Sequence, residues 1–204
     1  MEQDMTRGNP LSVIFMFTLP LAVGNIFQQL YNMADTIIVG RFVGADALAA
    51  VGSTGTIMFL LNGFAQGITA GFSVLTAQRF GAGKKEGVKE SVTNGVLLSI
   101  IGAILFTVLS CGIMNPLLHL MNTPENIFAQ AYEYISLISL GMVANVFYNL
   151  FSSYLRAVGN SRMPLVFLVL SACLNVVLDL ILIINFKMGV AGAAWATNLS
   201  QAIS

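Results

Sequence analysis

The chain has 204 residues, of which 56% are hydrophobic and only 9% are charged, and its formal net charge at pH 7 is zero. Soluble domains carry about 25% charged residues, so this composition excludes an ordinary soluble protein. The absence of a basic tract or an aromatic-basic platform argues against nucleic acid as a partner. Apolar runs of about twenty residues or more recur along the chain, as bilayer-spanning helices require. The composition therefore predicts an all-α, polytopic transmembrane helix bundle.

Six apolar segments follow one another and predict a single domain over residues 1–204. The sixth segment holds about fifteen residues, fewer than the roughly twenty that a bilayer crossing requires. We therefore expect the chain to be the N-terminal part of a longer protein, with its sixth helix incomplete. The predicted spans cover about residues 11–39, 47–77, 91–114, 127–155, 163–186 and 190–204.

The first span carries a polar stripe inside an otherwise apolar segment. On an α-helix the stripe occupies an arc of roughly 120°. Pro20 precedes the stripe, lacks an N–H and clashes with the preceding turn, so it is interpreted as a hinge. A kink without function is the alternative for this residue. The residues of the stripe are Asn25, Gln28, Gln29, Asn32, Asp35 and Thr36.

The second span carries glycine at four-residue spacing. Gly63, Gly67 and Gly71 predict a face on which a neighbouring helix packs closely. The charged stretch that follows, residues 78–90, is predicted to be a solvated loop between two spans.

The distribution of Lys and Arg predicts the orientation of the protein in the membrane. The N-terminus and the loops on its side hold seven of these residues, whereas the opposite loops hold only Arg41 and Lys187. The positive-inside rule then places the N-terminus in the cytoplasm, as part of a multi-pass protein of the plasma membrane. The seven residues are Arg7, Arg79, Lys84, Lys85, Lys89, Arg156 and Arg162.

Four polar residues from four different spans are predicted to lie at one depth. At 1.5 Å per residue, each sits roughly 6–11 Å below the outer end of its span. These residues are Asp35, Tyr134, Asp179 and Thr197. Asn175 lies one turn below Asp179 on the same helix face. Matched depth is a necessary condition for a shared site, and it is met.

The two acids among them require a cavity or a partner, because an ionised carboxylate in hydrocarbon costs at least about 2.5–3.5 kcal/mol. Without a function, Asp35 would reach outward or pair with Arg41, and Asp179 would hydrogen-bond within the bundle. As a pair, two buried carboxylates can take up a proton near neutral pH. They can also bind Na⁺ together with amide and hydroxyl oxygens. Both possibilities couple ion flow to transport, and both stay open.

Five motifs together resemble one known family. They are P-L-A-V-G-N-I-F-Q-Q-L-Y-N-M-A-D-T-I-I-V-G-R at 20–41, G-A-D-A-L-A-A-V-G at 44–52, L-R-A-V-G-N at 155–160, N-V-V-L-D at 175–179 and M-G-V-A-G-A-A-W-A-T at 188–197. On these motifs the chain resembles the N-terminal lobe of multidrug and toxic compound extrusion (MATE) transporters, of the bacterial NorM and DinF kind.

The resemblance implies twelve helices in two six-helix lobes that surround a central cavity and work by alternating access. It implies a cation or proton site at Asp35, Asn175, Asp179 and Thr197, at which Na⁺ is one possible ligand. It also implies that Pro20 matches the proline at which the first helix bends. The supporting residues are Tyr31 and Tyr134 near the ion, and Gln28 and Asn32 as cavity wall.

The predicted function is an Na⁺- or H⁺-coupled antiporter that exports organic cations and other amphipathic compounds, with no cofactor besides the coupling ion. Its partners would be membrane lipid, the substrates and the missing C-terminal lobe. A flippase for lipid-linked saccharides is an alternative, but it should hold basic residues inside its cavity, and here Lys and Arg lie at or near helix ends. A membrane protein without transport activity is the other alternative. An enzyme is disfavoured because no nucleophile–base pair or HExxH motif is present.

Overall fold

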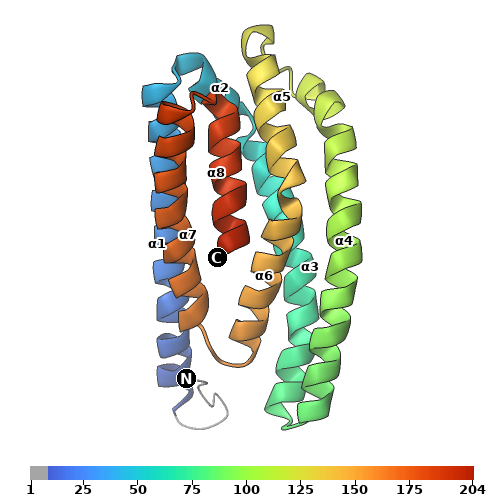
Figure 1. The fold of residues 1–204 in the computed structure, drawn as a ribbon. Helices are drawn as coiled ribbons and strands as arrows, with labels where there is room; N and C mark the ends of the chain where they lie inside the picture. Colours follow the sequence, from blue (N-terminus) through green and yellow to red (C-terminus); the bar gives the residue numbers. More distant parts are fainter. Residues whose placement is uncertain (1–8) are drawn as a thin grey trace.

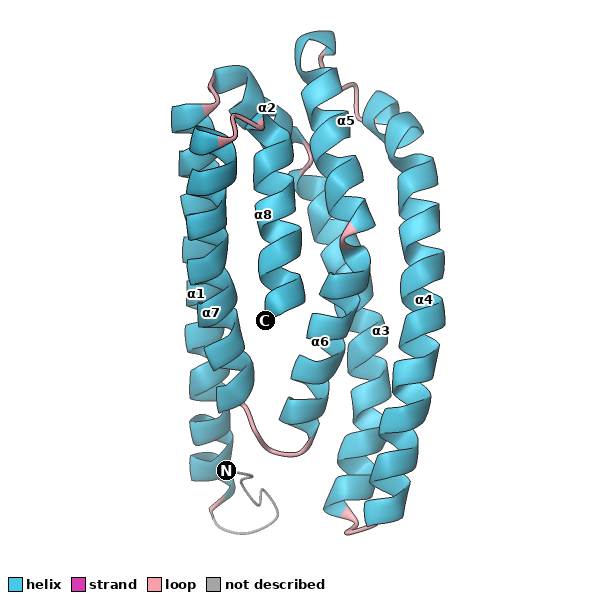
Figure 2. Ribbon diagram, viewed as in Figure 1, coloured by secondary structure: helices cyan, strands magenta, loops and turns pink. Residues whose placement is uncertain are grey.

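The computed structural model describes residues 9–204, so Arg7, which entered the prediction of orientation, lies outside the described residues. Every regular element in the described part is helical (Figures 1 and 2). The prediction of an all-α fold is therefore confirmed. The elements are α1 (Pro10–Phe42), α2 (Ala45–Ser53), α3 (Gly55–Gly81), α4 (Lys85–Leu120), α5 (Glu125–Leu140), α6 (Met142–Ala157), α7 (Arg162–Asp179), the π-helical η1 (Leu180–Asn185) and α8 (Gly189–Ile203).

The helices have the length and composition of membrane spans. Four segments are long and apolar enough to cross a bilayer, namely α1, α3, α4 and the combined α7–η1, and the bent pair α5–α6 makes a fifth. Their apolar side chains point mainly outward: in the most apolar 18-residue window of α1, only 6% of residues are buried. Lipid is the solvent that such a surface requires. The polytopic transmembrane class is confirmed.

Two predicted spans are each divided into two α-helices, and a third, at 163–186, changes from α7 to the π-helical η1 after Asp179. The span predicted at 47–77 is broken at Thr54, where the hydroxyls of Ser53 and Thr54 donate to the carbonyl oxygens of Ala50 and Val51, both at 2.7 Å. Side-chain hydroxyls that bond to nearby carbonyls compete with the regular helix pattern. The span predicted at 127–155 is broken at Gly141, where α5 and α6 meet at a bend of 49°.

The charged stretch at 78–90 is helical for most of its length, so the prediction of a loop there is wrong. Only Ala82–Lys84 separate α3 from α4, and Gly83 adopts the left-handed conformation (φ 70°) that favours glycine. The Arg79 guanidinium donates to the Gly87 carbonyl at 2.7 Å and to the Glu90 carboxylate at 3.0 Å. These bonds join the two helices beyond their apolar parts.

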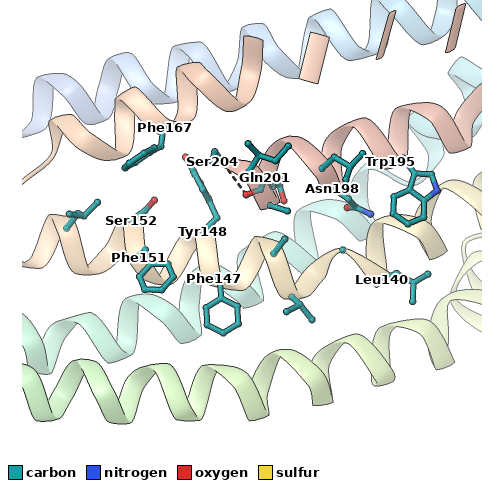
Figure 3. A pocket seen from close by; sticks show the side chains of 17 residues that line it. Leu140, Phe147, Tyr148, Phe151, Ser152, Phe167, Trp195, Asn198, Gln201 and Ser204 are labelled. Atoms are coloured by element: carbon teal, nitrogen blue, oxygen red, sulfur yellow. Dashed lines mark hydrogen bonds between the residues drawn. The ribbon is translucent and has the colours of Figure 1, made fainter. Parts of the chain in front are cut away.

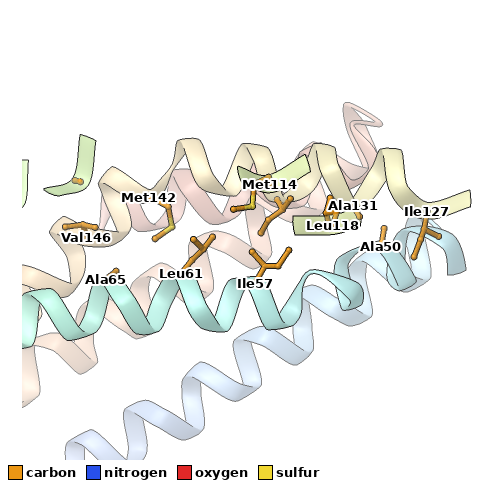
Figure 4. Packing of buried hydrophobic residues seen from close by; sticks show 12 residues of the cluster. Ala50, Ile57, Leu61, Ala65, Met114, Leu118, Ile127, Ala131, Met142 and Val146 are labelled. Atoms are coloured by element: carbon orange, nitrogen blue, oxygen red, sulfur yellow. The ribbon is translucent and has the colours of Figure 1, made fainter. Parts of the chain in front are cut away.

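The helices pack as two groups joined along α8. In Figure 1, α1 and α7 lie together on one side, α3, α4 and α6 on the other, and α8 descends between them. One buried cluster, which includes Leu61, Met114 and Val146, fills the space between α3, α4 and the α5–α6 pair (Figure 4). A second cluster, which includes Val39, Ile138 and Ala193, joins α1, α5 and α8. The second cluster holds together the helices that carry the predicted site.

The glycine stripe of α3 does not pack against another helix of this chain, so that prediction is wrong within residues 9–204. A Cβ added at Gly63, Gly67 or Gly71 would meet no atom within 4 Å. The helix instead packs through its opposite side, where Leu61 and Ala65 are buried. A small-residue face permits close packing but does not by itself select the partner helix.

Gly141, at the α5–α6 bend, is in the tightest part of the α8 interface. The Asn198 side chain of α8 donates from Nδ2 to the Leu137 carbonyl oxygen at 2.7 Å, and it lies directly against Gly141. A Cβ at this position would collide with the Asn198 amide group. The bend therefore depends on the absence of a side chain.

Gly141→Ala is expected to destabilise the protein by about 1–3 kcal/mol, because Asn198 must leave the Leu137 carbonyl or the helices must separate. The measurement is the thermal unfolding midpoint of the detergent-solubilised protein. Gly112→Ala on α4 is the matched control, since a Cβ there meets nothing within 4 Å. It should be neutral or slightly stabilising, because alanine favours the helix. Equal midpoints for the two variants would refute the role given to Gly141.

Candidate functional site

The polar residues predicted to share one depth come from four helices and converge in the structure. Helix α7 packs against both α1 and α8, and α5 packs against α8. On α1, Tyr31 and Asp35 are one turn apart, so they point to the same side. Asn175 and Asp179 share a face of α7 for the same reason. The site is thus built by four helices, through Tyr31, Asp35, Tyr134, Asn175, Asp179 and Thr197.

The Thr197 hydroxyl links three of these helices. It accepts a hydrogen bond from the Tyr31 hydroxyl at 3.3 Å and another from the Asn175 side-chain amide at 3.4 Å. Because both bonds use the oxygen as acceptor, the proton of Thr197 is available to a further acceptor. Thr197 therefore holds Tyr31 and Asn175 at fixed positions beside the two acids.

Four oxygen atoms of this site are buried without a hydrogen-bond partner among residues 9–204. They are Asp35 Oδ1, Asn175 Oδ1 and both carboxylate oxygens of Asp179. Asn175 and Asp179 have no exposed surface, and Asp35 is 8% exposed. Buried acceptors are nearly always paired, because an unpaired one costs about 1–3 kcal/mol and more when charged. A cation at this position could bind all four oxygens, whereas a proton between the two carboxyl groups would pair two of them.

The carboxyl groups of Asp35 and Asp179 are close enough to interact with each other. The Tyr134 phenol, which is 4% exposed, is close to both. Two adjoining buried carboxylates repel each other unless a positive charge lies between them.

The alternative partner of Asp35 was Arg41. Six residues further along, Arg41 points about 240° around the helix and is exposed, and within the described residues it makes no ion pair with Asp35.

Three predicted residues lie away from this cluster. Asn32 is exposed, and its carbonyl oxygen accepts the Thr36 hydroxyl at 2.7 Å. Gln28 is half-buried and lines a separate pocket closer to the N-terminal end of α1, together with Pro20. Helix α1 runs unbroken through Pro20. The cavity-wall role of Gln28 and Asn32 and the hinge role of Pro20 stay predictions.

An amide network that sequence reasoning did not assemble lies between α3, α6 and α8. Asn145 donates to Asn62 at 3.0 Å and to Gln201 at 3.2 Å, and Asn149 donates to Asn145 at 3.1 Å. The partners belong to segments that are distant in the sequence, so no local pattern pairs them. The network joins the two helix groups through side chains.

A cavity of about 760 Å³ opens between α6, α7 and the last turns of α8 (Figure 3). Its wall is mainly apolar and aromatic, with Tyr148, Phe167 and Trp195 among the lining side chains. Gln201 and Asn198 add a few polar groups. Both its size and its lining are typical of sites that hold drug-sized molecules.

Comparison with known proteins agrees with this architecture. The MatE family model matches residues 20–181. The probable multidrug resistance protein YpnP of Bacillus subtilis is 32% identical over 201 residues, and the match covers 98% of this chain and 45% of that protein. The probable multidrug resistance protein NorM of Thermotoga maritima is 30% identical over 193 residues, with 92% and 41% covered.

A solved structure shows the same fold. A MOP superfamily transporter from Pyrococcus furiosus superposes with a TM-score of 0.90 at 32% identity, over 98% of this chain and 44% of that one. The chain thus spans less than half the length of the relatives that it matches. The family model covers most of the chain, and the resemblance drawn from the five motifs is confirmed. The chain therefore belongs to the MatE family, that of the multidrug and toxic compound extrusion transporters.

Proposed function

We propose that this chain forms one lobe of an ion-coupled antiporter that exports organic cations and other amphipathic compounds by alternating access. One observation carries the proposal: two buried carboxylates from α1 and α7 adjoin, and three of their own oxygens and the Asn175 side-chain oxygen have no partner among the described residues. Such a set is costly to keep inside a membrane protein without a cation. The multidrug resistance names of the relatives support the substrate class.

The coupling ion would be held by Asp35, Asp179, Asn175 and Thr197. Na⁺ prefers hard oxygen ligands, and these residues supply carboxylate and amide oxygens. The Thr197 hydroxyl oxygen would bind the ion in place of one of the two hydrogen bonds that it accepts here. A proton shared between Asp35 and Asp179 would remove the repulsion between them equally well. In both cases the ion adds positive charge at the point where α1 meets α7. Ion binding would thus strengthen the contact between these helices.

This contact gives the ion a way to favour one conformation. A ligand shifts a conformational equilibrium only by its difference in affinity for the two states. A conformation in which Asp35 and Asp179 adjoin binds the ion tightly, and one in which α1 moves away binds it weakly. We propose that Pro20 permits this movement of α1, and that the substrate binds better to the other conformation, so the two ligands oppose each other.

We further propose that the N-terminus lies in the cytoplasm and that the chain works with a second lobe. The loops that contain Lys84 and Asn160 lie at the same end of the bundle as the start of α1 (Figure 1), which agrees with the positive-inside rule. The plasma membrane is the proposed location. The relatives are about twice as long as this chain, which supports a second lobe as partner.

The test is transport of the fluorescent organic cation ethidium in lipid vesicles that contain this lobe together with its second lobe. Na⁺ and H⁺ gradients are imposed separately. We expect ethidium to move against its own concentration gradient under at least one of them, and the ion that drives it is the coupling ion. Movement that is the same with and without a gradient, or no movement at all, would overturn the proposal.

A further inference from the structure

A second polar pocket, distinct from the acid cluster, lies closer to the cytoplasmic end proposed for the bundle. It has a volume of about 290 Å³ and is bounded by α1, α3, α6 and the start of α7. Gln28 lies in its wall, seven residues before Asp35, which places the pocket roughly 10 Å from the acid cluster along α1. None of the residues proposed to hold the ion lines this pocket.

The only charged side chain among the described residues that line this pocket is that of Arg156, in the last turn of α6. This side chain is half-buried, and its Nε donates to the Ser152 carbonyl oxygen at 3.1 Å. Within residues 9–204 its guanidinium forms no ion pair. Four of its five N–H donors have no described partner, and a guanidinium is always charged.

The neighbouring side chains add neutral hydrogen-bond donors on the other walls. Asn25 and Gln28 come from α1, Gln66 from α3, and the Tyr148 phenol lies close to the Arg156 guanidinium. A single cation with amide and hydroxyl donors around it is the arrangement that binds a carboxylate or phosphate group. The volume equals that of about ten water molecules, so it admits such a group with part of the molecule that carries it.

Arg156 could instead serve only to end α6, since a basic side chain in the last turn interacts favourably with the helix dipole. At the end of α6, however, the carbonyl oxygens of Tyr154, Leu155 and Arg156 already accept backbone N–H groups of the following turn, and the Arg156 Nε donates to Ser152 further back in the helix. That role does not explain why the rest of the guanidinium lies in a pocket that amide side chains line from two other helices.

We propose that the pocket around Arg156 binds an anionic group, a carboxylate or phosphate, carried by an amphipathic molecule. This deepens the proposed transport function, on which it rests, because it extends the substrate class from organic cations to amphipaths with an anionic end. A transported substrate or an anionic phospholipid could supply the same group. Pro20 also lines the pocket, so a bend of α1 at that residue would change the space available to the anion.

The test compares two dyes that differ by one charge. Rhodamine 110 has a free carboxylate, and rhodamine 123 is its methyl ester. Binding to the protein with both lobes, in phosphatidylcholine nanodiscs, is measured by fluorescence anisotropy. Arg156→Gln is expected to weaken rhodamine 110 binding about tenfold or more, as the loss of charge-assisted hydrogen bonds predicts. It should change rhodamine 123 binding by less than about twofold, which also shows that the variant is folded.

Two further variants serve as controls. Arg156→Lys keeps the charge and should restore part of the affinity for rhodamine 110. Arg162→Gln removes an exposed charge outside the pocket and should leave both dyes unaffected. Equal weakening of both dyes by Arg156→Gln, or no weakening of either, would overturn the anion site. Failure of the transport proposal would appear separately, as ethidium movement that does not depend on an ion gradient.

Phosphatidylglycerol added to the nanodiscs distinguishes the two sources of the anion. Competition with rhodamine 110 that is present in the wild type and absent from Arg156→Gln assigns a lipid headgroup to the pocket. No competition in the wild type assigns the pocket to the transported amphipath. Both results support an anion site. Competition that is equal in the two proteins would count against the lipid as the source and leave the transported amphipath as the ligand.

Discussion

Asp35→Asn is expected to abolish gradient-driven efflux while the protein still inserts and folds. Asparagine has nearly the same shape as aspartate, so the packing of α1 against α7 is kept. It carries no charge, however, and its amide does not take up a proton near neutral pH. Losing one of two charged ligands from a buried site costs about 3 kcal/mol or more, roughly a hundredfold in ion affinity.

The measurement is ethidium accumulation in vesicles under the driving gradient, and the variant should fall to the level of protein-free vesicles. Asp46→Asn is the matched control, because Asp46 is an exposed acid in the first turn of α2. It should transport like the wild type. Equal yield and a single symmetric elution peak for both variants would show that folding is intact. Wild-type efflux by Asp35→Asn would disprove the assignment of this residue.

The depth of the site could be predicted from the sequence, because the rise per residue of a helix is constant. Counting from the ends of four spans placed Asp35, Tyr134, Asp179 and Thr197 at one level, and the structure brings these residues together. The position of Asn175 was predicted from its separation of one turn from Asp179. These predictions needed only the positions of the helix ends, and an error of one turn did not alter them.

The direction in which each side chain points could not be predicted in the same way. The polar stripe of α1 spans an arc wider than the contact with α7, so only its Asp35 edge is buried, whereas Asn32 is exposed. Which edge faces inward depends on the partner helices and not on α1 itself. The partner of the glycine stripe of α3 could not be predicted either, because a face of small residues does not identify the helix that packs on it.

The helix breaks also depend on distant parts of the chain. The bend at Gly141 accompanies the entry of Asn198 from α8, which bonds to the Leu137 carbonyl. These residues are separated by a whole span, so no local pattern connects them. The pocket around Arg156 was missed for this reason, because its walls come from four helices. Here tertiary packing overrides local propensity.

Asp179→Asn is expected to have opposite effects on stability in the presence and absence of the coupling ion. Asp179 has no exposed surface, and neither of its carboxylate oxygens has a described partner. Without the ion, the wild type therefore bears the desolvation and repulsion of a buried charge, which a neutral amide of the same shape relieves. The ion-free variant should unfold at a higher temperature than the ion-free wild type.

With the ion, the order reverses, because only the wild type gains binding free energy. A ligand that binds the folded state at a hundred times its dissociation constant adds about 2.7 kcal/mol, or several degrees in the unfolding midpoint. The measurement is thermal unfolding in choline buffer at alkaline pH, with Na⁺ added in one series and the pH lowered in the other. Asp46→Asn should respond like the wild type in both. If the ion raises the unfolding midpoint of Asp179→Asn and of the wild type equally, the ion binds elsewhere. If it raises neither midpoint, the two acids have a structural role, because a site built to exchange an ion must be less stable when it is empty.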